Sequence, residues 1–136
     1  YDIEGTDTDA VLIIGDNALK IIDNGYITLD LGQSWYEFTR LPFVYALWVV
    51  KRDRRIPGLN NLLINAKESG IRSVKALATT ESQRLQLTPE RCLNYLTNSI
   101  RYDFGKDEIK GFLAFYQHAV SLGLAPKGVE IIFNET

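Results

Sequence analysis

The sequence predicts an α/β chain in which strands and short helices come first and a helical layer follows. Two apolar runs, at residues 10–14 and 43–50, have the composition of buried strands. Short helical patterns lie between them, whereas the pattern beyond residue 57 is almost wholly helical. Strands followed by helices indicate a mixed sheet that is covered by the later part of the chain.

The first fifty residues alternate between strand and helix signals. Residues 10–14 are apolar on both faces, which favours a parallel strand. Asn24 and Gly25 are a turn or helix-end signal, and Pro42 is expected to stop the second helix. We expect strands over residues 10–14, 26–31 and 43–50. Helices are expected between them, over residues 16–22 and 32–40.

The second half carries helix signals almost throughout. A helical pattern covers residues 57–82, and Gly70 interrupts it, so one broken helix or two helices are both open. Thr88-Pro89-Glu90 predicts a helix start, with Thr as the capping residue and Pro in the first turn. A last helix is expected from Lys106 to Gly123 and Pro126, and a short strand over residues 129–133.

Bulk composition excludes several classes of protein. The chain has 136 residues, 46% of them hydrophobic and 24% charged, with a net charge of −2, which is typical of one ordinary globular domain. No basic field for nucleic acid exists, and the cluster at residues 51–55 is either a solvated linker or an anion contact. The apolar runs are too short for a membrane span. One cysteine excludes an internal disulfide. Since the chain begins with Tyr1 and contains no methionine, we expect a fragment, a processed chain or a cut sequence.

Candidate site residues lie at the ends of the two buried runs. Gly15, Asp16 and Asn17 follow the first run, where an open α/β sheet binds its ligands, and a helix begins directly after them. The alternative is a plain capped helix with nothing bound. Pro42 and Phe43 join a helix to the second run, and Phe43 either stacks on a flat ligand or fills the core.

Other reactive residues give no site. His118 is the single histidine and is expected at the surface of its helix, and Cys92 is expected in the core. No metal-ligand spacing, phosphate loop or nucleophile elbow is present. We therefore predict no metal site.

Three stretches together carry a resemblance to a known family. The first is Ile-Gly-Asp at residues 14–16. The second, at residues 30–50, has Asp-Leu-Gly and a Trp, followed by Leu-Pro-Phe-Val and a second Trp. The third, at residues 100–124, is Ile-Arg-Tyr before an acidic helix. This pattern resembles the chorismate dehydratases of the futalosine route to menaquinone, and the chain is similar to their C-terminal half.

The resemblance implies a cytoplasmic lyase with a type 2 periplasmic-binding-protein-like fold, that is, two α/β lobes around a cleft. Residues 1–50 would then be part of one lobe, ending at a strand that crosses the hinge, and residues 51–136 a mainly helical portion packed on the lobes. The reaction converts chorismate to 3-[(1-carboxyvinyl)oxy]benzoate without a cofactor. Gly15, Asp16 and Asn17 would lie at the cleft, and Pro42 and Phe43 near the hinge.

Several expectations about the complete protein follow from the same resemblance. The family residues nearest the substrate lie in its N-terminal half, so the catalytic residues are unknown and this chain alone is not expected to be active. A second chain, or a swapped copy of this one, would complete the sheet. Two alternatives stay open, namely the 1,4-dihydroxy-6-naphthoate synthase of the same pathway and a solute-binding lobe without chemistry.

Overall fold

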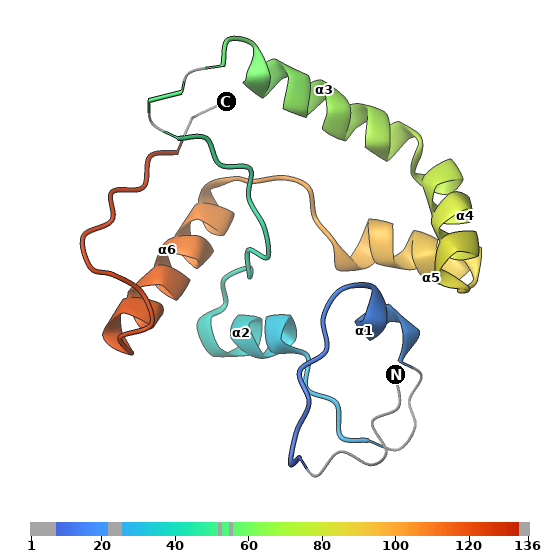
Figure 1. The fold of residues 1–136 in the computed structure, drawn as a ribbon, viewed down its shortest axis with the longest axis horizontal. Helices are drawn as coiled ribbons and strands as arrows, with labels where there is room; N and C mark the ends of the chain where they lie inside the picture. Colours follow the sequence, from blue (N-terminus) through green and yellow to red (C-terminus); the bar gives the residue numbers. More distant parts are fainter. Residues whose placement is uncertain (1–7, 22–25, 52, 55, 134–136) are drawn as a thin grey trace. The chain divides into compact units, whose positions relative to one another are not determined.

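The computed structural model of the protein describes residues 8–21, 26–51, 53–54 and 56–133, and these residues form helices but no strands (Figure 1). The predicted α/β class, with its mixed sheet and its type 2 periplasmic-binding-protein-like lobes, is therefore wrong for the described residues. The helical segments are α1 (Asp16–Lys20), α2 (Leu31–Thr39), α3 (Leu59–Arg72), α4 (Val74–Leu85), α5 (Pro89–Asn94), the π-helix η1 (Tyr95–Ser99) and α6 (Lys106–Ser121).

The predicted strands fail because they find no partners. Residues 10–14, 26–30, 43–50 and 129–133 have no regular secondary structure. No backbone hydrogen bond links residues 10–14 or 46–50 to another described residue. Their apolar side chains face solvent, with Leu12 74% and Trp48 83% exposed. An apolar run indicates burial, but a strand also needs a neighbour for its N–H and C=O groups.

The chain divides into two compact units, and each is described by itself. Unit 1 contains Tyr1–Thr28 and Lys67–Arg101, and unit 2 contains Leu29–Ala66 and Tyr102–Thr136. The predicted division at residue 50 concerns lobes of a complete protein, so it stays a prediction.

The core of unit 1 lies between α4 and α5. Ala78, Leu85 and Cys92 are its buried hydrophobic side chains, which confirms the predicted core position of Cys92. The left-handed conformation of Gln86 ends α4 and lets the chain turn back into α5. Half-buried leucines complete this small core, namely Leu19, Leu87, Leu93 and Leu96.

Local signals place the ends of the unit 1 helices. The Thr88 hydroxyl accepts a hydrogen bond from the Arg91 N–H at 3.2 Å, so the predicted cap of α5 is confirmed. The long helical pattern is two helices, α3 and α4, as one of the two alternatives had it. The break falls at Ser73 rather than at Gly70, because a helix tolerates a single glycine and α3 continues through Gly70.

In unit 2, α2 and α6 hold the aromatic side chains together. The Asp30 carboxylate caps α2 by accepting from the Gln33 N–H at 2.9 Å. The Glu108 carboxylate accepts from the Gly105 N–H at 2.9 Å at the start of α6. Both helices agree with the predictions within two residues, and α2 ends before Pro42 with Arg40 in a left-handed conformation.

One close contact fixes the segment after α2 against α6. Gly111 is the buried residue of α6, and the space that a β-carbon would need there is filled by the carbonyl oxygen of Pro42. Only glycine allows this approach of helix and backbone. The contact therefore positions Pro42 and Phe43, which are both candidate site residues.

Some expectations fall outside the described residues. The turn signal at Asn24 and Gly25 is among these, as are Arg52 and Arg55 of the basic cluster. In the described part of the chain, no helix combines the length and the apolar character that crossing a membrane requires.

We predict that Gly111→Ala destabilises the protein. Alanine favours a helix over glycine by about 1 kcal/mol, but the added methyl group meets the Pro42 carbonyl, and overpacking costs about 1–3 kcal/mol. The urea midpoint should therefore fall. Gly70→Ala is the matched control, because open space surrounds Gly70 inside α3. Its midpoint should rise, and an equal rise in both variants would contradict the close contact.

We also predict that Thr88→Ala lowers the free energy of unfolding by about 1 kcal/mol, because it removes the hydroxyl that caps α5. Urea unfolding followed by circular dichroism measures the change. Thr88→Ser keeps an acceptor and should retain most of the stability. If Ser and Ala were equally destabilising, the hydroxyl would not be the stabilising group.

Candidate functional site

The first candidate group, Gly15-Asp16-Asn17, lies at the start of α1 in unit 1. Gly15 has a φ of 63°, a left-handed conformation that favours glycine, and its carbonyl accepts from the Ala18 N–H at 3.0 Å. No side chain caps the helix, so the plain capping role considered for Asp16 or Asn17 is not seen. Asn17 is exposed.

Asp16 is instead part of a charged triplet that the sequence analysis missed. Its carboxylate accepts from Nη2 of Arg84 at 2.9 Å, and Nε of Arg84 donates to Glu81 at 2.6 Å. The hydrogen bond to Glu81, and next that to Asp16, raise the pKa of the Arg84 guanidinium above its ordinary value. With two carboxylates and one cation, the triplet has one net negative charge.

This triplet is a surface arrangement rather than an enclosed catalytic centre. The side chains of Arg84 and Asp16 are 57% and 52% exposed. Ion pairs in water contribute little to stability, so the pairing orients Asp16 more than it stabilises the fold. Arg84 is separated from Asp16 by 68 residues, and no local spacing in the sequence connects them.

The second candidate group, Pro42 and Phe43, belongs to unit 2. The ring of Phe43 is half-buried and contacts Phe115 at 5.1 Å and Tyr45 at 4.8 Å between centroids, both in edge-on geometry. Trp35 contacts the same ring at 6.1 Å. Rings from α2, from α6 and from its own segment thus surround Phe43, as expected of a residue that fills a core.

Trp35 is the centre of this aromatic cluster. Its indole lies edge-on to Phe115 at 5.6 Å and to His118 at 5.9 Å. The indole N–H is buried and has no hydrogen-bond acceptor among the described residues. His118 is exposed and also contacts Phe38, which confirms its predicted place at the surface of α6.

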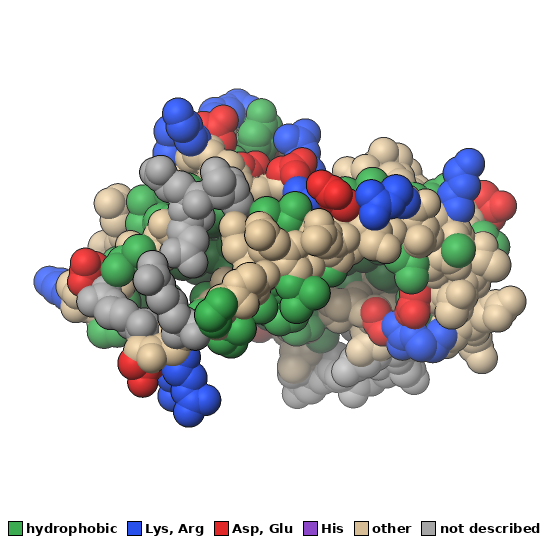
Figure 2. Space-filling view, turned by 90° about the horizontal axis from the view of Figure 1, so that it is seen from above, with side chains coloured by type: hydrophobic (Ala, Val, Ile, Leu, Met, Phe, Trp, Pro, Cys, Tyr) green, Lys and Arg blue, Asp and Glu red, His purple; other side chains and the backbone are tan. Residues whose placement is uncertain are grey.

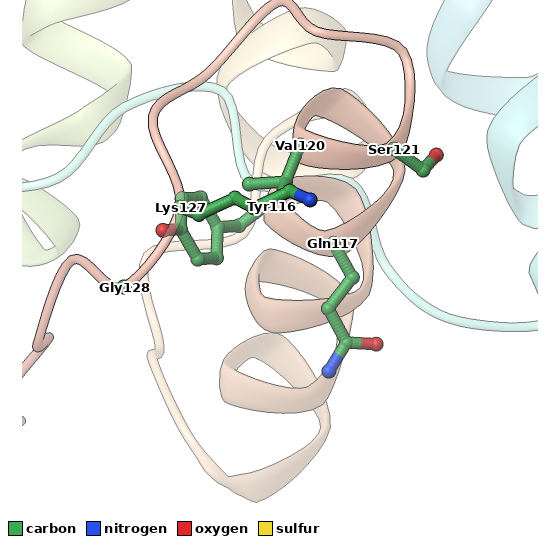
Figure 3. Close-up of a pocket in the computed structure, with 6 residues that line it drawn as sticks. All are labelled: Tyr116, Gln117, Val120, Ser121, Lys127 and Gly128. Carbon is green, nitrogen blue, oxygen red and sulfur yellow. The ribbon is translucent and has the colours of Figure 1, made fainter.

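A shallow pocket of about 340 Å³ lies beside α6 in unit 2 (Figure 3). Tyr116 closes one side, since its hydroxyl donates to the Pro126 carbonyl at 2.7 Å and accepts from the Val129 N–H at 3.1 Å. In Figure 3, Lys127 lies beside Tyr116, whereas Gln117 extends in another direction. The remaining lining residues are Val120, Ser121 and Gly128.

The polar groups of this pocket do not converge. Ser121 is already committed, because its hydroxyl donates to the His118 carbonyl at 2.8 Å. The other polar side chains of the lining are Lys127 and Gln117, which extend in different directions (Figure 3), and Lys127 is the one cation among the lining residues. A single cation can attract one carboxylate, but it offers no site for a molecule with two. None of the pocket residues was predicted to be a site residue, and the sequence contains no motif that would have indicated a site there.

Metal chemistry finds no support in the described residues, where no group of three His, Cys, Asp or Glu side chains could hold an ion. The two candidate groups belong to different units, Gly15 to Asn17 in unit 1 and Pro42 with Phe43 in unit 2. The first group carries charge and the second carries aromatic surface, so neither alone combines an acid–base group with a water-excluding wall.

Comparisons with known proteins identify the chain more directly than its geometry does. The chorismate dehydratase of Thermus thermophilus is 31% identical in an alignment of 140 positions, gaps included, and the alignment covers 87% of this chain and 49% of that protein. The chain thus spans about half the length of this curated relative. No solved structure matches it.

The family comparison covers the same region. The profile of a family described as menaquinone biosynthesis matches residues 2–121, most of the chain. This range contains both candidate groups, together with Arg84 and the aromatic cluster. The chain therefore belongs to the menaquinone biosynthesis family, as its resemblance to the chorismate dehydratases indicated.

Proposed function

We propose that this chain serves the dehydration of chorismate to 3-[(1-carboxyvinyl)oxy]benzoate in the futalosine route to menaquinone. The observation that carries the proposal is the 31% identity to a chorismate dehydratase along 87% of the chain. Membership of a menaquinone biosynthesis family supports the pathway.

The chemistry of this reaction determines which functional groups a site must provide. Chorismate loses one hydroxyl group and one ring proton as water, and the ring becomes aromatic, so the reaction needs no oxidant, reductant or cofactor. The site must bind two carboxylates, assist the departure of the hydroxyl group and receive the proton. Hydrogen-bond donors and one acid–base group are sufficient for these tasks.

Within this proposal Asp16 and Asn17 face the substrate, and Gly15 allows the backbone to approach it. The carboxylate of Asp16 is held by Arg84, and the proposal assigns the same guanidinium group to a carboxylate of the substrate. Pro42 and Phe43 take no part in the reaction within this proposal. They fix their own segment against α6, Pro42 through Gly111 and Phe43 through the aromatic cluster. The residues that carry the proton transfer are not assigned in this chain.

The proposal includes a complementary polypeptide and a cytoplasmic location. Only three hydrophobic side chains are buried in the described part of the chain, so the substrate site needs further walls. A biosynthetic dehydratase acts without export, whereas a solute-binding lobe would have to be secreted.

We expect the purified protein, assayed with its complementary polypeptide, to convert chorismate to a product lighter by one water. Liquid chromatography with mass detection follows the conversion. A heat-denatured sample is the control for the slow spontaneous decay of chorismate. Recovery of unchanged chorismate, bound tightly to the protein, would contradict the dehydratase and favour a binding function.

We predict that Asp16→Asn lowers turnover of chorismate by about tenfold or more, since it removes the charge that faces the substrate. The urea midpoint should change little, because exposed ion pairs contribute little to stability. Glu81→Gln is the matched control, because it removes the other carboxylate that binds Arg84. Equal losses in both variants would assign the effect to Arg84, and unchanged turnover in Asp16→Asn would make Asp16 purely structural.

A further inference from the structure

The helix α1 is too short to be stable by itself, and it carries the candidate residues Asp16 and Asn17. It has five residues, none of them buried, and no side chain caps its start. Isolated helices shorter than about 12–15 residues are marginal in water. Contacts with the rest of unit 1 must therefore hold α1 in place, and the orientation of Asp16 depends on them.

Two attachments of α1 come from α4 and from the small core of unit 1. Arg84 on α4 donates to the Asp16 carboxylate at 2.9 Å, in the first turn of α1. The half-buried side chain of Leu19 packs against the core. Because Arg84 also donates to Glu81, its hold on Asp16 is shared. Neither contact involves the carbonyl groups at the C-terminal end of α1.

The third attachment is made by Arg91 on α5. Its Nη2 donates to the Ile21 carbonyl oxygen at 2.9 Å, at the C-terminal end of α1. The last carbonyl groups of a helix have no partner within it, and a cation beside them also complements the helix dipole. Arg91 thus caps α1 from another helix, although 70 residues separate the two partners in the sequence.

The position of Arg91 is itself fixed by the start of α5. Its backbone N–H donates to the Thr88 hydroxyl at 3.2 Å, so one residue is held through its backbone and binds α1 through its side chain. Basic side chains lie beside acidic ones at several places on the surface in Figure 2, and Arg72 with Glu68 is such a pair within one helix. Arg91 differs from that pair, because its acceptor is a backbone carbonyl and the bond joins α5 to the end of α1.

We propose that Arg91 is a positioning residue for the candidate site. Together with Arg84 it clamps α1 at both ends, and it thereby orients Asp16 without contacting the substrate. Asp16 and Ile21 lie about 7–8 Å apart along a helix, so Arg91 acts through α1 and not on the reacting atoms. The role in catalysis rests on the proposed function, whereas the clamp itself does not.

Limited proteolysis tests the clamp without chorismate. Trypsin cleaves after Lys20 when α1 opens locally, and mass spectrometry measures the rate at this bond. Arg91→Ala should raise that rate by about threefold or more, because the open form becomes more populated. Arg91→Lys, which keeps a charged donor, should restore part of the protection. Cleavage after Lys110 in α6 is the internal reference and should not change.

Arg72→Ala is the matched control, because Arg72 is also an exposed arginine of unit 1 but has its partner Glu68 on the same helix. It should leave the cleavage rate at Lys20 unchanged. If Arg91→Ala also left this rate unchanged, or if Arg72→Ala raised it as much, Arg91 would not clamp α1 and the proposal would be wrong. This conclusion holds whether or not the protein converts chorismate.

Turnover of chorismate, measured with the complementary polypeptide, tests the positioning role. Arg91→Ala should lower kcat/KM by about threefold or more. It should cause little further loss in the Asp16→Asn protein, because both changes remove the same oriented carboxylate. Losses that multiply would mean that Arg91 acts independently of Asp16, which would contradict the positioning role. If the unchanged protein has no turnover, the proposed function fails and this role in catalysis fails with it, while proteolysis alone decides the clamp.

Discussion

Backbone hydrogen bonding within helices is the interaction on which the described structure depends. The N–H and C=O groups in the interior of a helix pair within the same segment, so they need no distant partner, and the end groups are satisfied by local caps such as those at Asp30 and Thr88. Long-range burial adds little, since Ala78, Leu85 and Cys92 are the buried hydrophobic residues described. Isolated short helices are marginal in water. Contacts such as that between Gly111 and Pro42 therefore matter, because each one joins a helix to something outside itself.

The same dependence explains which parts of the fold could be predicted from the sequence. The helix start at Thr88 and the helix end before Pro42 were predicted from the sequence, because a cap or a stop signal depends on only a few neighbouring residues. The prediction of strands at residues 10–14 and 43–50 was wrong, because an apolar run does not indicate which segment would pair with it. The break at Ser73 was displaced by three residues from the expected Gly70, since glycine weakens a helix without ending it.

In the candidate site, only the residue whose type determines its backbone conformation could be predicted from the sequence. Gly15 was recognised, and it occupies the left-handed conformation that glycine tolerates best. The partner of Asp16 was not, because 68 residues separate it from Arg84 and many arginines could have paired with it. The enclosure of Phe43 likewise depends on Phe115, which lies on another helix. Long-range pairs are a property of packing, and a single sequence does not specify them.

The proposed chemistry depends on how well water is kept away from the charged triplet. Loss of a hydroxyl group is assisted by donors whose effect is strongest where solvent is excluded. Asp16 and Arg84 are more than half exposed, so water screens their charges. The proposed chemistry therefore requires that water is excluded from around Asp16 and Arg84, because only then do their charges act at full strength on the hydroxyl group that leaves.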